Sequence, residues 1–156
     1  MDKKHKREAR SLCLQILFAN NFSDSDFENL FSNFYLAQDS DLEKKSYTEK
    51  QIEYASRLFS NVIKEKDAID VLIESKLVNW EMNRLAMIDR MILRMSITEM
   101  LFLDDIPPKV SITEAVEIAK EFSSDDSSGF INGIMDAIYN DKFNKKIKTK
   151  SNQEKI

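Results

Sequence analysis

Glycine is nearly absent from this chain: its 156 residues include only Gly129 and Gly133. Loops that cradle phosphate groups need several glycines, because only a backbone without side chains can approach the anion closely. The sequence therefore excludes a P-loop and a glycine-rich dinucleotide-binding loop.

Histidine and cysteine are equally scarce, with one residue of each. His5 lies in a charged N-terminal segment, so we expect neither a Ser-His or Cys-His nucleophile nor a histidine-based zinc site. Cys13 cannot form an internal disulfide, and its apolar neighbours predict a buried thiol. The 27 Asp and Glu residues mostly follow the spacing of a solvated helix face. The prediction is a protein without these nucleophilic sites that holds no metal or cofactor.

Long hydrophobic runs are also missing. No apolar run approaches the ~20 residues that a helix needs to span a bilayer. The start of the chain is interrupted by polar side chains and is unlike a signal peptide. We therefore expect a cytoplasmic protein with no membrane partner, and its 42% hydrophobic residues are enough for one folded core.

Charge is unevenly distributed. Residues 1–10 carry five Lys and Arg against two acids, a net charge of +3, and residues 141–156 carry six Lys against two acids, +4. Since the total is −4, the intervening residues hold −11. An acidic body with basic ends predicts nucleic-acid binding at a local patch at most, because the body repels non-specific contact.

Apolar residues recur with helical periodicity along nearly the whole chain. The pattern predicts helices over residues 7–20, 24–36, 48–64 and 67–77, a central helix over 83–103, apolar on most sides, and two more that begin at Ser111 and Phe130. Ser111 and Glu114 fit a capping box, and residues 123–129 fit a loop. We expect an all-α single domain over residues 1–141 and a flexible, lysine-rich tail over residues 142–156.

Two segments of the C-terminal half form a specific pattern. The first joins Asn79-Trp80 to the helix Asp89-Arg90-Met91-Ile92-Leu93-Arg94. The second joins Pro108-Lys109-Val110-Ser111-Ile112 to Glu-Ala-Val-Glu-Ile-Ala-Lys at 114–120 and Phe-Ile-Asn-Gly at 130–133. As a set these motifs resemble the NusB family of transcription antitermination factors, over residues 6–139. The resemblance implies a NusB-like bundle of about seven helices that binds boxA-type RNA with a small-subunit ribosomal protein, NusE, on elongating RNA polymerase.

The resemblance places the RNA surface at the start of the first helix. By spacing alone, Lys6, Arg7 and Arg10 lie along one exposed side and attract phosphates, although an exposed basic N-terminus can also serve solubility only. The turn before the last helix would complete the surface, where spacing alone favours a core Phe130 and a capping Asp126. The predicted RNA-binding residues are Lys3, Lys4, Lys6, Arg7, Arg10, Gln15, Phe18, Asp126 and Phe130. Asp2 and Glu8 are acidic where the family is often basic, and Gly129 stands where a basic residue can occur.

The central helix carries a polar strip. The resemblance favours Asp89, Arg90 and Glu99 for the face that binds the ribosomal protein, since mixed charge beside methionines suits a protein interface. For Arg94 we expect an internal ion pair, and for Trp80 a packing role.

Three functions remain open at this point. The leading one is a non-catalytic antitermination adaptor. The alternatives are an RNA-targeting module that acts with a separate ribosomal RNA methyltransferase subunit, and a helical scaffold without an RNA role. The sequence also leaves open a homodimer formed through the basic region.

Overall fold

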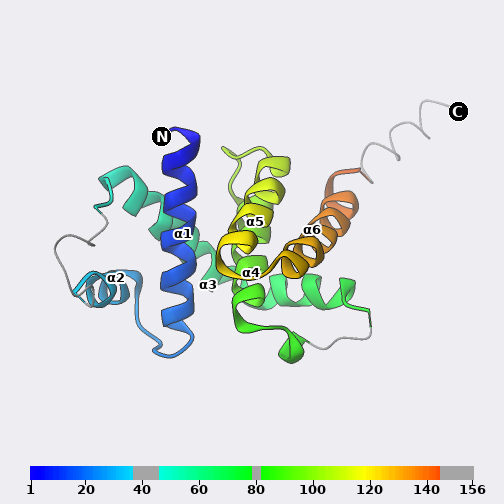
Figure 1. Ribbon diagram of the computed structural model, residues 1–156, viewed down its shortest axis with the longest axis horizontal. Coiled ribbons are helices and arrows are strands. Elements are labelled where there is room, and N and C mark those ends of the chain that lie inside the picture. The colour runs from blue at the N-terminus through cyan, green and yellow to red at the C-terminus, as the bar shows by residue number, and fades with distance from the viewer. Residues whose placement is uncertain (37–45, 79–81, 145–156) are drawn as a thin grey trace, which may run out of the picture. The chain divides into compact units, whose positions relative to one another are not determined.

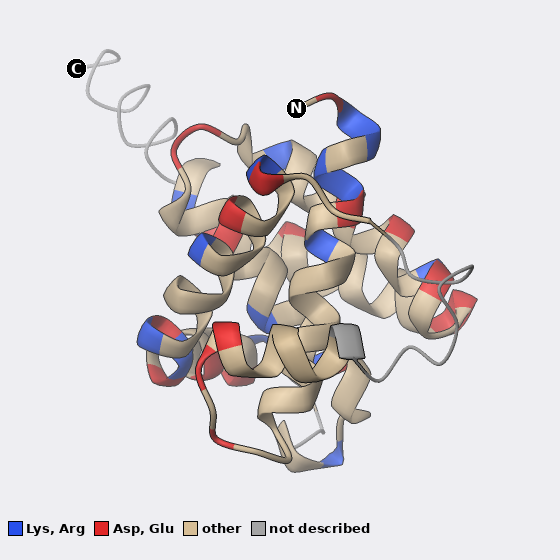
Figure 2. Ribbon diagram, turned by 90° about the vertical axis from the view of Figure 1, so that its left-hand side faces the viewer, with Lys and Arg blue, Asp and Glu red and all other residues tan. Residues whose placement is uncertain are grey.

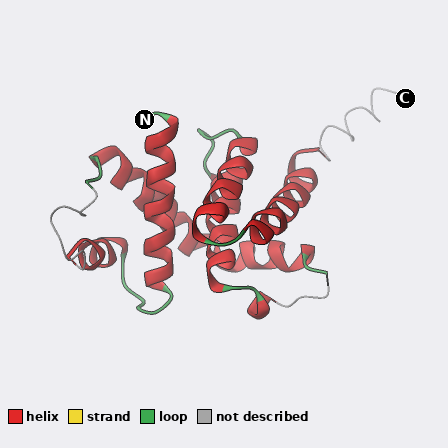
Figure 3. Cartoon of the chain, viewed as in Figure 1, coloured by secondary structure: helices red, strands yellow, loops and turns green. Residues whose placement is uncertain are grey.

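The computed structural model describes residues 1–36, 46–78 and 82–144, and every element in these ranges is helical (Figure 1, Figure 3). The all-α prediction is therefore confirmed. The chain divides into two compact units, Met1–Lys66 and Asp67–Ile156. The α-helices are α1 (Lys3–Asn20), α2 (Phe27–Leu36), α3 (Glu49–Lys76), α4 (Met87–Phe102), α5 (Pro108–Phe122) and α6 (Asp125–Tyr139). A 3-10 turn, η1 (Met82–Arg84), precedes α4, and a π-helical turn, η2 (Asn140–Asn144), follows α6.

The described ranges thus hold six α-helices where about seven were expected. The main reason is α3, which runs without a break through Lys64-Glu65-Lys66-Asp67, where we expected two helices with a kink between them. These four residues include no proline or glycine, and Lys and Glu are good helix formers. The 3.6-residue pattern therefore continues across a locally polar stretch.

In the first unit, α1 carries the buried stripe that its periodicity predicts. Leu12, Cys13 and Ile16 are fully buried, so the expected burial of the cysteine thiol is confirmed. Phe27 of α2 stacks on Phe31 with ring centroids 5.9 Å apart and tilts against Phe59 of α3 at 5.7 Å. These contacts tie α2 to α3, because aromatic rings bury large areas and favour such geometries.

In the second unit, α4 is the central element. All ten of its residues from Met91 to Met100 are buried, as expected of a helix that is apolar on most sides. It packs against α5 and α6, which also pack against each other. Arg94 of α4 makes the predicted internal ion pair: its Nε and Nη2 donate to the two carboxylate oxygens of Asp70 at 2.7 and 2.8 Å.

The starts of the last two helices differ from the prediction. The helix expected from Ser111 already begins at Pro108, whose missing N–H costs nothing in a first turn. Ser111 therefore lies inside α5, where its hydroxyl donates to Glu99 at 2.7 Å instead of capping the helix. Similarly, α6 begins at Asp125 because the Ser124 hydroxyl accepts a hydrogen bond from the Ser127 amide at 3.1 Å. The loop expected over residues 123–129 is thus mostly helix.

Two predictions fall outside the described residues: the packing role of Trp80 and most of the lysine-rich tail. Among the helices of the described ranges, none combines the length and the apolar character that crossing a bilayer demands.

Candidate nucleic-acid interface

The first two turns of α1 are rich in basic residues (Figure 2). Asp2 caps the helix, and its Oδ1 accepts a hydrogen bond from the His5 amide at 2.8 Å. This backbone hydrogen bond holds the pKa of the Asp2 carboxyl below its usual value, with a smaller contribution from the His5 side chain. Lys3 and Lys4 are exposed, and Lys6 and Arg7 are half-buried. We call Lys3, Lys4, Lys6 and Arg7 the basic ridge.

Arg10 does not belong to this exposed surface. It is only 3% exposed, so the exposure that we expected of it is wrong. Its guanidinium lies 6.0 Å from the ring centroid of Tyr54 in α3, and Arg57 approaches the same ring at 5.5 Å. The reason is that every residue of α1 from Ala9 to Leu14 is buried, which confines the exposed basic surface to the first two turns. Arg10 instead stabilises the packing of α1 against α3 next to the ridge, through this cation–π contact.

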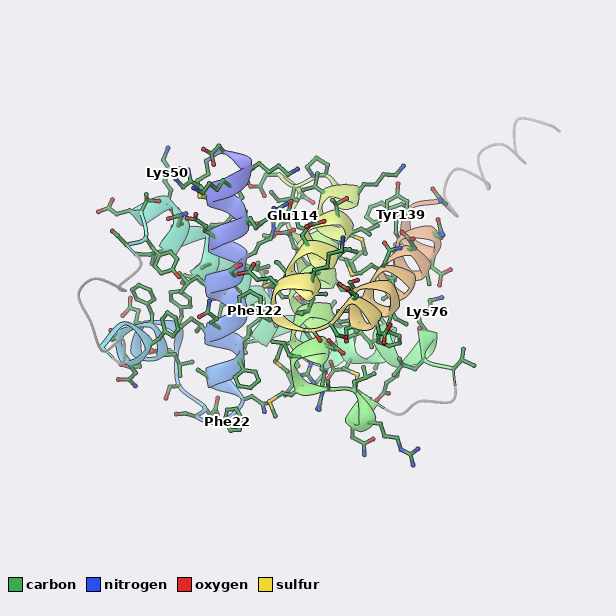
Figure 4. The ribbon with its side chains drawn as sticks, in the orientation of Figure 1. Phe22, Lys50, Lys76, Glu114, Phe122 and Tyr139 are labelled. Atoms are coloured by element: carbon green, nitrogen blue, oxygen red, sulfur yellow. The ribbon has the colours of Figure 1, made fainter. Side chains whose placement is uncertain are left out.

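The other two predicted residues of α1 lie further along the helix. Gln15 is half-buried, and its Nε2 donates to the Ser11 carbonyl of the same helix at 3.2 Å. Phe18 is 38% exposed and meets Phe22 edge to face, with ring centroids 5.4 Å apart. Phe22 lies just beyond the C-terminal end of α1 and is 71% exposed (Figure 4). We did not predict a role for Phe22, although its position four residues after Phe18 was a signal for this pair.

In the second unit, Asp126 and Phe130 lie one turn apart on α6 and line the same pocket. Asp126 is exposed and is not the helix cap that we expected, since Ser124 has that role. Phe130 is half-buried. The pocket has a volume of about 340 Å³ and is lined by Arg84, Leu85, Ala86, Asp89, Asp126, Ser127 and Phe130. The pocket therefore brings together Asp89, a predicted partner-binding residue, and Asp126 and Phe130, two predicted RNA-binding residues.

Two of the three predicted partner-binding residues are turned inward. Asp89 is 8% exposed, and its two carboxylate oxygens accept hydrogen bonds from Ser123 Oγ at 2.8 Å and Ser127 Oγ at 2.9 Å. Glu99 is 1% exposed and accepts the hydrogen bond from Ser111. Only Arg90 keeps part of its side chain accessible. Asp89 and Glu99 can therefore influence a bound partner only by shaping the surface around them.

Replacing Asp89 with alanine tests its internal role. The variant leaves the hydroxyls of Ser123 and Ser127 without their acceptor, so we expect the free energy of unfolding to fall by about 1–2 kcal/mol. Chemical denaturation measures this change. Asp136→Ala, an exposed acid of α6, serves as the control and should change stability by less than about 0.5 kcal/mol. An Asp89→Ala variant as stable as the control would mean that the hydrogen bonds contribute nothing.

Comparisons with known proteins agree with this architecture. The chain is 39% identical to transcription antitermination protein NusB of Chloroherpeton thalassium, over 94% of this chain and 66% of that protein, slightly less than two thirds of its length. It is 40% identical to transcription antitermination protein NusB of Bacillus licheniformis, over 87% of this chain and 97% of that protein. The fold and these relatives define a helical protein of the transcription antitermination class.

Solved structures match the same fold. NusB of T. maritima superimposes with a TM-score of 0.72 at 36% identity, covering 85% of this chain and 89% of that one. Antitermination factors NusB and NusE in complex with double-stranded RNA provide a second match, with a TM-score of 0.74 at 24% identity, covering 88% of this chain and 98% of that one. The NusB family model matches residues 7–140. The chain belongs to the NusB family.

Proposed function

We propose that this protein is a non-catalytic, cytoplasmic antitermination adaptor. It binds boxA-type single-stranded RNA together with a small-subunit ribosomal protein that acts as NusE. The complex then joins elongating RNA polymerase and supports transcription of ribosomal RNA. The observation that carries the proposal is the basic ridge: four cationic side chains on the first two turns of α1, all exposed or half-buried.

The ridge suits a phosphate backbone better than it suits helix stability. Cations beside a helix N-terminus are unfavourable, because the helix dipole favours anions there. A bound phosphate would reverse that penalty and release condensed counterions, with a salt slope of roughly 0.7 per contact for single strands. Since the protein carries a net charge of −4, its attraction for RNA has to be local.

Aromatic side chains supply the second requirement of single-strand binding. Phe18 and Phe22 present an edge-to-face pair at the surface, and Phe130 forms part of a pocket wall. Unpaired bases stack on such rings with little regard for sequence, and each stack stabilises a complex by about 1–3 kcal/mol. In this proposal phosphate contacts with the ridge place the strand, and the rings of Phe18 and Phe22 hold its bases.

The ribosomal partner is proposed from a structural relative that contains NusB and NusE together with RNA. On this chain the accessible charged groups near the pocket are Arg84, Arg90 and Asp126, whereas Asp89 and Glu99 act from inside. A partner that adds its own RNA contacts must raise the RNA affinity of this protein, and by linkage RNA must raise the affinity for the partner by the same factor.

The test is a titration of a boxA-type single-stranded RNA with and without the ribosomal protein, at two salt concentrations. We expect the partner to tighten RNA binding by about 5- to 150-fold, the usual range of coupling between two sites. A double-stranded RNA of the same sequence and a scrambled single strand are the controls. An unchanged RNA affinity on adding the partner would reject the adaptor model. If the protein bound no RNA at all, the helical scaffold without an RNA role would be the remaining function.

A further inference from the structure

The side chain of Gln51 joins the start of α3 to the start of α1. Its Oε1 accepts a hydrogen bond from the backbone N–H of Thr48 at 3.0 Å, and the Thr48 hydroxyl accepts one from the backbone N–H of Gln51 at 3.2 Å. Together these bonds form a reciprocal capping box at the N-terminus of α3. The side-chain nitrogen of Gln51, Nε2, donates to two groups of α1, the His5 carbonyl and Glu8 Oε2, each at 3.1 Å.

Gln51 is 1% exposed, and both ends of its side-chain amide are hydrogen-bonded. A buried amide in this state fixes its neighbours, because each lost bond would leave a polar group without a partner. The groups that it fixes belong to the turns of α1 that carry the basic ridge. Arg10 and Tyr54 add a second contact between the two helices, one turn further along each of them.

The same bonds explain an acidic residue in a basic segment. At about 100° per residue, Lys3, Lys6 and Arg7 fall on one arc of α1, whereas Glu8 lies about 100° beyond Arg7, on the same side of the helix as Lys4. The bond to Gln51 holds the Glu8 carboxylate toward α3. Tyr47 reports the same neighbourhood: burial raises the pKa of its phenol, and the charge of Glu8 raises it further. The Glu8 carboxylate is therefore held toward α3, on the Lys4 side of the helix and away from Lys3, Lys6 and Arg7.

We propose that Gln51 is a positioning residue for RNA binding: its side-chain amide holds the first two turns of α1 and keeps the Glu8 carboxylate away from Lys3, Lys6 and Arg7. This inference rests on the proposed function and adds to it a residue that never touches the RNA. Its physical basis is pre-organisation, since a surface already ordered in the free protein loses less conformational freedom when the ligand binds.

The experiment compares three variants of the full chain with the same boxA-type RNA. Gln51→Met keeps the volume and removes the donors, and we expect its dissociation constant to rise about threefold. Gln51→Glu also places a second carboxylate beside Glu8, so a rise of about tenfold is expected. The exchanged pair Glu8→Gln with Gln51→Glu restores the amide-to-carboxylate bond between positions 8 and 51 at unchanged total charge, but not the bond to the His5 carbonyl, so we expect it to bind within about threefold of the original chain.

Asn61→Glu is the matched control for charge. Asn61 also lies on α3, but its side-chain amide donates to the backbone carbonyl of Arg57 in the same helix and not to α1. The control adds the same charge about 15 Å further along α3 and should leave RNA binding unchanged. Hydrogen exchange in the absence of RNA completes the set: amides of residues 7–10 should exchange faster in Gln51→Met than in the original chain and return toward the original rate in the exchanged pair.

The outcomes separate this inference from the proposed function. If the original chain binds RNA and the folded Gln51→Met and Gln51→Glu variants bind equally well, the positioning role is rejected and the proposed function stands. An exchanged pair that binds RNA no better than Gln51→Glu would also overturn it, because the pair restores the hydrogen bond between residues 8 and 51. If the original chain binds no RNA, the proposed function fails. Unchanged hydrogen-exchange rates of residues 7–10 in Gln51→Met would independently reject the ordering of α1 by Gln51.

Discussion

Replacing Asp70 with alanine is expected to lower the free energy of unfolding by about 3 kcal/mol, because it leaves the guanidinium of Arg94 inside the second unit without its counter-charge. The Arg94 side chain is 9% exposed and that of Asp70 is 22% exposed. The partial access of water to Asp70 keeps the expected loss at the lower end of the range for buried pairs. Chemical denaturation of the variant measures the loss.

Two further variants define what the Asp70 result means. Asp67→Ala removes an exposed acid one turn earlier in α3 and should change stability by less than about 0.5 kcal/mol. The double replacement Asp70→Leu with Arg94→Met exchanges both charges for apolar groups and should recover most of the stability, since no charge is then left unpaired. A loss as large in the double variant as in Asp70→Ala would mean that packing, and not the unpaired charge, is responsible.

Replacing Lys3, Lys6 and Arg7 together by alanine is expected to weaken binding of boxA-type RNA about 50-fold at low salt, since each cation lost removes a phosphate contact. The slope of log affinity against log salt concentration should decrease by about 2, at roughly 0.7 per contact. Stability should change little, because basic residues at a helix N-terminus are unfavourable for the helix. A filter-binding or anisotropy titration at several salt concentrations measures both quantities.

The matched control removes three other exposed lysines, Lys64, Lys66 and Lys142, and so changes the net charge by the same amount. It should weaken RNA binding less than about threefold, through long-range charge alone. An equal loss in the control and in the ridge variant would show that RNA responds to net charge only. A site on the first two turns of α1 would then be rejected.

The hydrophobic period predicted the helices well. It placed the end of α1 at Asn20 and identified α4 as the central helix, because both depend on which residues are apolar and on nothing further away. Helix starts were predicted less well. α5 begins at Pro108, which needs no N–H in a first turn, and α6 begins after the Ser124 cap, so both helices are longer at their N-terminal ends than the apolar pattern predicted.

The candidate site was likewise predicted only in part from the sequence. Periodicity predicted a helix only from residue 7, so it placed Arg7 at the helix start but not Lys3, Lys4 and Lys6, which the structure includes because α1 begins at Lys3. It could not tell that Arg10 is buried, since that depends on Tyr54, which lies 44 residues away along the chain. Nor could it tell that Asp89 and Glu99 accept hydrogen bonds from serines of the following helices.

By itself the sequence determined the helical class of this protein, the acidic body with a basic beginning, and the motifs of the NusB family, because each depends on the identity and order of nearby residues. Tertiary structure alone decided which charges face water and which face the interior. Gln51 could not be read from its surroundings in the sequence, since its role comes from two hydrogen bonds to α1, more than 40 positions earlier. Burial and hydrogen bonding are properties of neighbours in space, and those neighbours are established only when the helices pack.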